Sequence, residues 1–111
     1  DYDREMALVA DYRNPQTGQR EIIGVGRLIK ATGASEAEFA ILINDQFQRK
    51  GMGLELLRRL IQYGRNEKIQ RIVGDILLEN VGMQKVCRKL GISLQYSYEE
   101  EVMKAELELV D

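Results

Sequence analysis

Runs of apolar residues bounded by turn-forming residues fill the first half of the chain. Three such runs cover residues 5–12, 21–30 and 36–43, and they are rich in the β-branched and aliphatic residues that suit strands. Residues 14–18, which include the single proline, and residues 31–35 separate the runs and carry turn chemistry. Because these connections are short, the pattern predicts three strands in an antiparallel meander.

Helical spacing appears in the second half of the chain. In residues 54–67 the apolar positions recur at intervals of three and four residues, which is the spacing of one buried helix face. These positions are Leu57, Leu60, Ile61 and Gly64. Residues 70–78 again resemble a strand. Because a helix connects this strand to the strand 36–43, we expect the two strands to pair in parallel.

A second helix and a hairpin complete the predicted order of elements. Asn80 is a residue type that caps helix N-termini, and Gly91 is a typical C-terminal stop. The apolar stripe between them consists of Met83, Val86, Cys87 and Leu90. Residues 92–98 and 103–110 then predict a hairpin. Residues 1–111 are therefore expected to form a single α+β domain, with strands and helices alternating as in α/β units.

Composition excludes several classes of function. The net charge of −2 gives no basic excess for a nucleic-acid partner, and no stretch has the ~20 apolar residues that cross a bilayer, so we expect neither partner. Cys87 is the single cysteine, which excludes an intrachain disulfide and suits a cytoplasmic protein. The absence of histidine excludes Ser-His-Asp and Cys-His catalysis and argues against a metal site.

The segment Gln48-Arg49-Lys50-Gly51-Met52-Gly53 joins the strand 36–43 to the helix 54–67. The first amides of a helix have no partner within it, and the helix dipole favours negative charge there, so this turn predicts an anion site. Arg49 and Lys50 add cationic donors. The segment lacks the Gly-Lys-Ser/Thr ending of a Walker A loop and the third glycine of a dinucleotide fingerprint. The simpler alternative is a helix that begins after two glycines.

The spacing Gln48-x-x-Gly51-x-Gly53 resembles the pyrophosphate loop of the GNAT superfamily of acetyltransferases. In that family the loop amides hold the diphosphate of acetyl-CoA, so the resemblance implies this cosubstrate and no metal. It also implies a mixed, mostly antiparallel sheet with a parallel pair at the family's strands 4 and 5 and with flanking helices. The family's first strand and first two helices have no counterpart in this sequence, which starts at Asp1 without methionine. We therefore expect an N-terminally truncated piece of a larger multidomain chain.

The resemblance assigns roles to residues outside the loop. The segment Ile41-Leu42-Ile43 matches the strand whose backbone, in the family, pairs with the pantetheine arm and polarises the thioester carbonyl. Asn80 matches an asparagine that contacts the same arm. Many members have a tyrosine general acid where this chain has Cys87, and the alternative for Cys87 is a small buried residue. The implied cofactor-binding residues are Ile41, Leu42, Ile43, Gln48, Arg49, Lys50, Gly51, Met52, Gly53, Leu54, Asn80 and Cys87.

Glu38 is the candidate catalytic base. Alternation along the strand puts it on the same face as Ala40 and Leu42, so the sequence predicts a carboxylate in a partly apolar setting over a cleft. The alternative is a solvated strand-end residue. Segments 4–10, 36–40 and 99–100 resemble the Pat-type protein lysine acetyltransferases, whose GNAT domain follows an acyl-CoA-synthetase-like region. In that group the matching glutamate is the base.

The resemblance thus implies an acetyl-CoA-dependent N-acetyltransferase. It would move the acetyl group to a lysine ε-amine of a protein by direct attack, and an acyl-CoA synthetase is one candidate protein substrate. Two alternatives stay open. One is a GNAT enzyme that acts on a small amine or a protein N-terminus, and the other is a non-catalytic module that senses acetyl-CoA.

Overall fold

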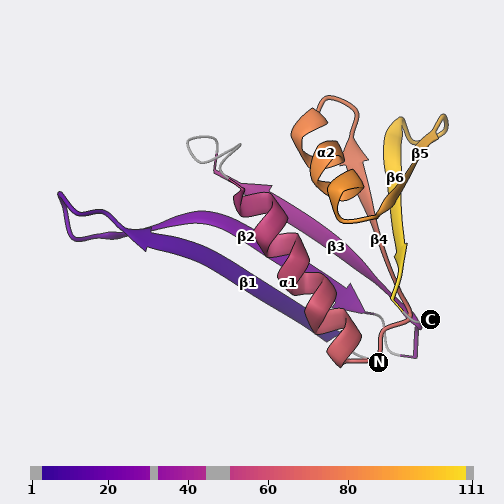
Figure 1. The fold of residues 1–111 in the computed structure, drawn as a ribbon, viewed down its shortest axis with the longest axis horizontal. Helices are drawn as coiled ribbons and strands as arrows, with labels where there is room; N and C mark the ends of the chain where they lie inside the picture. Colours follow the sequence, from indigo (N-terminus) through magenta and orange to yellow (C-terminus); the bar gives the residue numbers. More distant parts are fainter. Residues whose placement is uncertain (1–3, 31–32, 45–50, 110–111) are drawn as a thin grey trace.

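The computed structural model describes residues 4–30, 33–44 and 51–109 as one sheet of six strands with two helices (Figure 1). The elements follow the predicted order, and each boundary lies within two residues of the prediction. They are β1 (Arg4–Arg13), β2 (Arg20–Lys30), β3 (Glu36–Ile43), α1 (Met52–Asn66), β4 (Arg71–Leu77), α2 (Val81–Lys89), β5 (Ser93–Ser97) and β6 (Val102–Glu108).

The strand order in the sheet is β1-β2-β3-β4-β6-β5, with β3 and β4 parallel and the other neighbours antiparallel. The predicted GNAT-like architecture, a mostly antiparallel sheet with one parallel pair, is therefore confirmed. The parallel pairing extends over only three residues of each strand, from Glu36 opposite Arg71 to Glu38 opposite Val73. Past this point β3 and β4 diverge (Figure 1), so the sheet is split open at the end where both strands lead into helices.

Ion pairs and a backbone hydrogen bond hold β3 and β4 together at the end where they are paired. The Arg71 guanidinium on β4 donates to Glu36 Oε1 on β3 at 2.7 Å, and carboxylate oxygens of Glu106 and Glu108 on β6 each lie 3.6 Å from it. The amide of Gln70 also donates to the carbonyl of Ser35 at 2.9 Å. The closed end is thus tied across three strands, while at the other end β3 and β4 are not paired with each other.

Both helices lie on one face of the sheet, and the hydrophobic core lies between them and the strands (Figure 1). Leu57 and Leu60, from the predicted stripe of α1, have no exposed surface. Two glycines of β2 allow α1 to pack closely, since a Cβ on Gly24 would lie 3.1 Å from Leu56 Cδ1 and one on Gly26 would lie 3.3 Å from Leu60 Cδ1.

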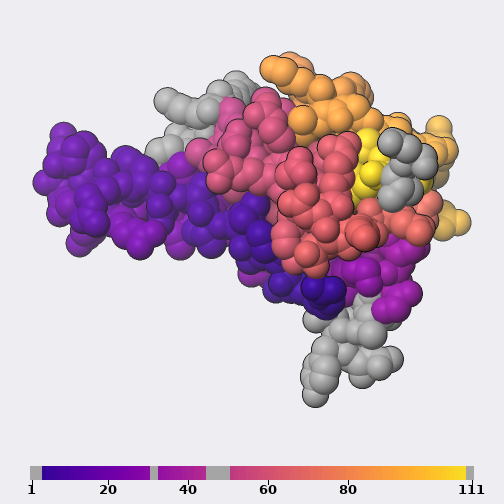
Figure 2. All heavy atoms as spheres, turned by 60° about the horizontal axis from the view of Figure 1, so that its bottom comes forward, coloured from indigo at the N-terminus to yellow at the C-terminus, as the bar shows by residue number. Residues whose placement is uncertain are grey.

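The opposite face of the sheet carries no helix among the described residues, and we call it the uncovered face. Leu42 is 73% exposed there, and Glu38 and Ala40 are exposed on the same face. The long β1–β2 hairpin projects beyond the rest of the molecule (Figures 1 and 2). Neither described helix is long and apolar enough to span a membrane.

Candidate functional site

The divergence of β3 and β4 creates an open cleft between them. One part, of about 330 Å³, lies between the end of β3 and the N-termini of the two helices and is lined by Gly51 and Gly53, among others. A second part, of about 250 Å³, lies between the strands themselves and is lined by residues 39–42 and 75–77. The two parts share Ile41, Asn80 and Met83 as lining residues, so we treat them as one cleft.

The N-terminus of α1 forms one wall of this cleft. Gly51 precedes the helix with φ 80° and ψ 0°, a left-handed conformation that glycine adopts without steric cost. The amides of Met52, Gly53 and Leu54 belong to the first turn, where no intrahelical acceptor is within reach, and no side chain among the described residues caps them. These donors and the positive end of the helix dipole make the wall suited to an anion. The predicted Gln48, Arg49 and Lys50 lie outside the described residues.

Asn80 forms the opposite wall, at the N-terminus of α2. Its Oδ1 accepts from the amide of Met83 at 3.0 Å, so the predicted N-cap is confirmed. This bond engages the side-chain oxygen, and Asn80 lines both parts of the cleft, so its Nδ2 group is the side-chain donor that remains for a ligand. A single side chain can therefore both fix the start of α2 and offer a hydrogen bond to a ligand.

Replacing Asn80 separates these two roles. Asn80→Ala should lower the free energy of unfolding by about 1 kcal/mol, because the first turn of α2 loses its cap. Asn80→Asp should keep most of the stability, since aspartate caps equally well, but it loses the amide donor and adds negative charge beside the proposed anion site. Urea unfolding measures the first effect and calorimetric titration with acetyl-CoA measures the second. Equal losses of affinity and stability in both variants would contradict this division of roles.

The strand segment 41–43 presents its side chains to both faces of the sheet. Ile41 and Ile43 point to the helix side, where they lie near the glycines of β2 and line the cleft, whereas Leu42 points to the uncovered face. β2 pairs with this whole segment on one side, while β4 has already separated from it on the other. The segment therefore borders the cleft along its length.

Glu38 lies at the last residue pair before β3 and β4 separate, opposite Val73 of β4 and Ile29 of β2. It is exposed on the uncovered face, so the expectation of a partly apolar setting is wrong, and the carboxylate is open to solvent as in the alternative interpretation. Among the described residues Glu38 is not part of the cleft lining, but its neighbours Phe39 and Ala40 are. A base here would reach an acceptor that approaches from the uncovered face.

Cys87 is not brought to the cleft. Its side chain has no exposed surface and belongs to the same core cluster as Leu57, Leu60 and Ile72. Burial raises the pKa of the Cys87 thiol from 9.0 to about 11. The thiol is therefore protonated at neutral pH and contributes by packing, and its predicted place among the cofactor-binding residues stays a prediction.

The buried thiol predicts a pH dependence of stability. Because the pKa of Cys87 is higher in the folded state, its contribution is fully present below about pH 9 and is lost as the pH rises through about 11. Wild type should therefore lose more stability between pH 8 and 10.5 than Cys87→Ala does, as measured by urea unfolding. Other titrating groups are common to both proteins and cancel in this comparison. Parallel pH profiles would show that the thiol ionises equally well in both states.

Met83 is a cleft residue that the sequence pattern did not single out. It follows Asn80 by three residues on the buried stripe of α2, and its terminal methyl lies 3.2 Å from where a Cβ of Gly53 would stand. Gly53 therefore serves close packing between the two helix N-termini as well as access to the α1 amides. The signal that could have indicated this contact is an apolar residue in the first turn of a capped helix.

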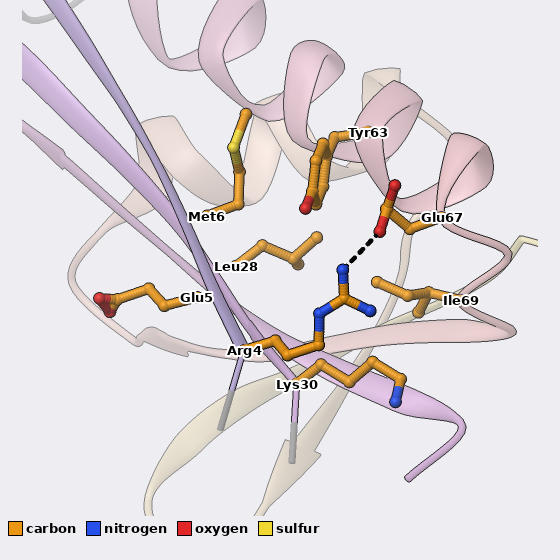
Figure 3. A pocket seen from close by; sticks show the side chains of 8 residues that line it. All are labelled: Arg4, Glu5, Met6, Leu28, Lys30, Tyr63, Glu67 and Ile69. Carbon is orange, nitrogen blue, oxygen red and sulfur yellow. Dashed lines mark hydrogen bonds and ion pairs between the residues drawn. The ribbon is translucent and has the colours of Figure 1, made fainter. Parts of the chain in front are cut away.

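A smaller hollow lies under the C-terminal half of α1 (Figure 3). Met6, Leu28 and Tyr63 line it, and the ion pair of Arg4 with Glu67, 2.9 Å long, spans one side. Its volume of about 20 Å³ is enough for roughly one water molecule. The hollow lies at the other end of α1 from the cleft and is too small to be the substrate site. The described residues also hold no group of three acidic, histidine or cysteine side chains placed to bind a metal.

Comparison with known proteins gives a consistent picture. The family model described as Acetyltransferase (GNAT) domain matches residues 2–93. An acetyltransferase of Pseudomonas aeruginosa is 28% identical over 91 residues, which are 82% of this chain and 48% of that protein. This chain thus spans about half the length of that curated relative.

Two solved structures share the fold. The GNAT domain of S. lividans PAT is similar with a TM-score of 0.79 and 28% identity, over 95% of this chain and 61% of that chain. The spermidine N-acetyltransferase from Vibrio cholerae, in complex with CoA and spermine, is similar with a TM-score of 0.76 and 22% identity, over 95% of this chain and 66% of that chain. The likeness to the second protein concerns the fold alone.

Proposed function

Since this chain belongs to the GNAT acetyltransferase domain family, we propose that it transfers the acetyl group of acetyl-CoA to an amine, and that this amine is the ε-amine of a protein lysine. The observation that carries the proposal is the cleft between β3 and β4, with the uncapped first turn of α1 at one end. A cosubstrate with an anionic diphosphate and a long, narrow arm fits these two features together.

The residues of the cleft suit acetyl-CoA in chemical terms. The amides of Met52, Gly53 and Leu54 would hold the diphosphate, and the positive φ of Gly51 lets the backbone approach it closely. The β3 segment 41–43 would lie along the pantetheine arm. Asn80 would donate its Nδ2–H to the arm from the other wall. Bound acetyl-CoA supplies a thioester, whose acyl carbon is open to attack by an amine.

The acceptor would approach from the uncovered face of the sheet. A free lysine has a pKa near ~10.4, so almost all of it is protonated and cannot attack at neutral pH. Glu38, exposed on this face beside the mouth of the cleft, would remove the proton directly or through one water. The amine nitrogen then forms a bond to the acyl carbon and the carbon–sulfur bond breaks. The nitrogen gives up its surplus proton, the CoA thiolate takes up a proton, and the proton held by Glu38 returns to solvent.

Support for a protein lysine as acceptor comes from two sources. One is the resemblance of segments 4–10, 36–40 and 99–100 to the Pat-type protein lysine acetyltransferases, together with the likeness to the GNAT domain of S. lividans PAT at 28% identity. The other is the exposed position of Glu38, because a carboxylate on an open sheet face is accessible to a lysine on the surface of another protein. An acyl-CoA synthetase is the first protein substrate that we would test. The alternative acceptors named from the sequence, a small amine or a protein N-terminus, are distinguished by experiment.

Release of free CoA thiol tests the proposal. The reaction should be measured with acetyl-CoA and each of a lysine peptide, a peptide with only a free N-terminus, spermidine, and no acceptor. It should use this chain and any longer natural chain that contains it. We expect release with the lysine peptide at a rate well above the other three. Release with only spermidine or only the N-terminal peptide would show that this amine, and not lysine, is the acceptor. Binding of acetyl-CoA without any release of CoA would indicate a sensing module.

A further inference from the structure

Phe39 and Gly74 meet at the point where β3 and β4 separate. They are the residues directly after the last parallel pair, Glu38 and Val73. The Phe39 ring lies so close to Gly74 that a Cβ there would be 2.7, 2.8 and 3.0 Å from three ring atoms. The ring is 4% exposed and still borders the part of the cleft between the strands. Phe39 therefore fills the narrow end of the cleft, and glycine at position 74 is what leaves room for it.

The walls next to Phe39 are apolar. Ile76 of β4 and Met83 of α2 border the same cavity and are 6% and 9% exposed. Phe39, Ile41 and Ile43 alternate along one face of β3, so a chain that follows this face from the N-terminus of α1 passes Ile43 and Ile41 first. It would end at the Phe39 ring, about 14 Å from Ile43 at the usual rise per strand residue.

From this geometry we infer that Phe39 determines the length of acyl chain that the cleft accepts. The inference rests on the proposed function, because it assumes that the thioester end of an acyl-CoA points to the narrow end of the cleft. The reaction is unchanged by chain length: the amine nitrogen bonds to the acyl carbon and loses a proton, the carbon–sulfur bond breaks, and the thiolate is protonated. Each added methylene pushes the chain end against the ring, so acetyl is preferred over propionyl and butyryl.

Substitutions at both contact partners test the role of Phe39. Phe39→Leu shortens the side chain and should raise the ratio of kcat/KM for butyryl-CoA to that for acetyl-CoA by about tenfold or more, the effect of a methylene or two in an apolar pocket. Adding Gly74→Ala to Phe39→Leu puts a methyl group into the vacated space and should return the ratio toward the wild-type value. Phe39→Met replaces the ring with a flexible chain of about the volume of leucine, so this second variant should raise the ratio in the same direction.

A matched control removes one methylene from the core elsewhere. Ile92→Val alters a residue that is 3% exposed and does not border the cleft, so it should reduce stability without changing the acyl ratio. Calorimetric titration with butyryl-CoA and acetyl-CoA measures the corresponding ratio of binding affinities, which does not depend on turnover.

The outcomes separate this inference from the proposed function. A wild type that neither binds nor uses any acyl-CoA would overturn the proposed function. A wild type that uses acetyl-CoA, together with folded Phe39→Leu and Phe39→Met variants whose acyl ratio is unchanged, would overturn the role of Phe39 alone. A ratio that rises in Phe39→Leu, falls again with Gly74→Ala and does not move in Ile92→Val would support it.

Discussion

Glu38→Gln is expected to lower kcat for a lysine peptide by about 10²–10⁴-fold, the usual range for loss of a general base. The substitution keeps the size and hydrogen-bonding shape of the side chain but removes its capacity to take a proton. Because Glu38 lies on the uncovered face and outside the cleft lining, the affinity for acetyl-CoA should change little. The remaining rate should rise with pH as the acceptor amine loses its proton unaided.

Steady-state kinetics between pH 6.5 and 10 measure this effect, with Glu5→Gln as the control. Glu5 is also an exposed glutamate on the uncovered face, on β1 opposite Ile29. Glu5→Gln therefore removes the same charge two strands away from the mouth of the cleft. It should retain a near-normal kcat. Near-normal kcat in Glu38→Gln at pH 7 would mean that another residue is the base.

Gly51→Val is expected to weaken acetyl-CoA binding by roughly 10²-fold or more while the protein stays folded. A β-branched residue cannot keep φ at 80° without strain, so the turn into α1 must shift. The first-turn amides then lose their position against the diphosphate, and hydrogen bonds to charged groups contribute about 1.5–3 kcal/mol each.

The control for Gly51 is Gly18→Val in the β1–β2 turn. Gly18 has a similar positive φ of 74° and equally open space around its Cβ position, so valine there introduces the same kind of backbone strain away from the cleft. Calorimetric titration should show normal affinity in Gly18→Val and a large loss in Gly51→Val. The same affinity in both folded variants would remove the N-terminus of α1 from the site.

Sequence periodicity and capping residues were enough to predict the eight elements that the described residues form, because each has a local signal. The strands are apolar runs bounded by turn-forming residues. Helix α1 carries its stripe of Leu57, Leu60 and Ile61, and α2 begins at the capping Asn80. The parallel pairing of β3 with β4 also followed from local information, since parallel neighbours need a long crossover connection and this connection is usually a helix.

The shape of the cleft could not be predicted in the same way. The point where β3 and β4 separate depends on contacts between residues far apart in sequence, such as Arg71 with Glu36 on the closed side and Phe39 with Gly74 at the narrow end. The exposure of Glu38 was only one of two interpretations of the sequence, for a related reason. Alternation shows which residues share a face, but it does not show whether another element covers that face.

The most direct test of the central claim is an amide NMR titration of the protein with acetyl-CoA. Binding in the cleft between β3 and β4 should shift the amide signals of Ile41, Met52, Gly53, Leu54 and Asn80 in a saturable way. The signals of Tyr63 and Glu67, at the far end of α1, should stay in place. Saturable shifts confined to the far end of α1, or no shifts at millimolar acetyl-CoA, would contradict the assignment of this cleft as the acetyl-CoA site.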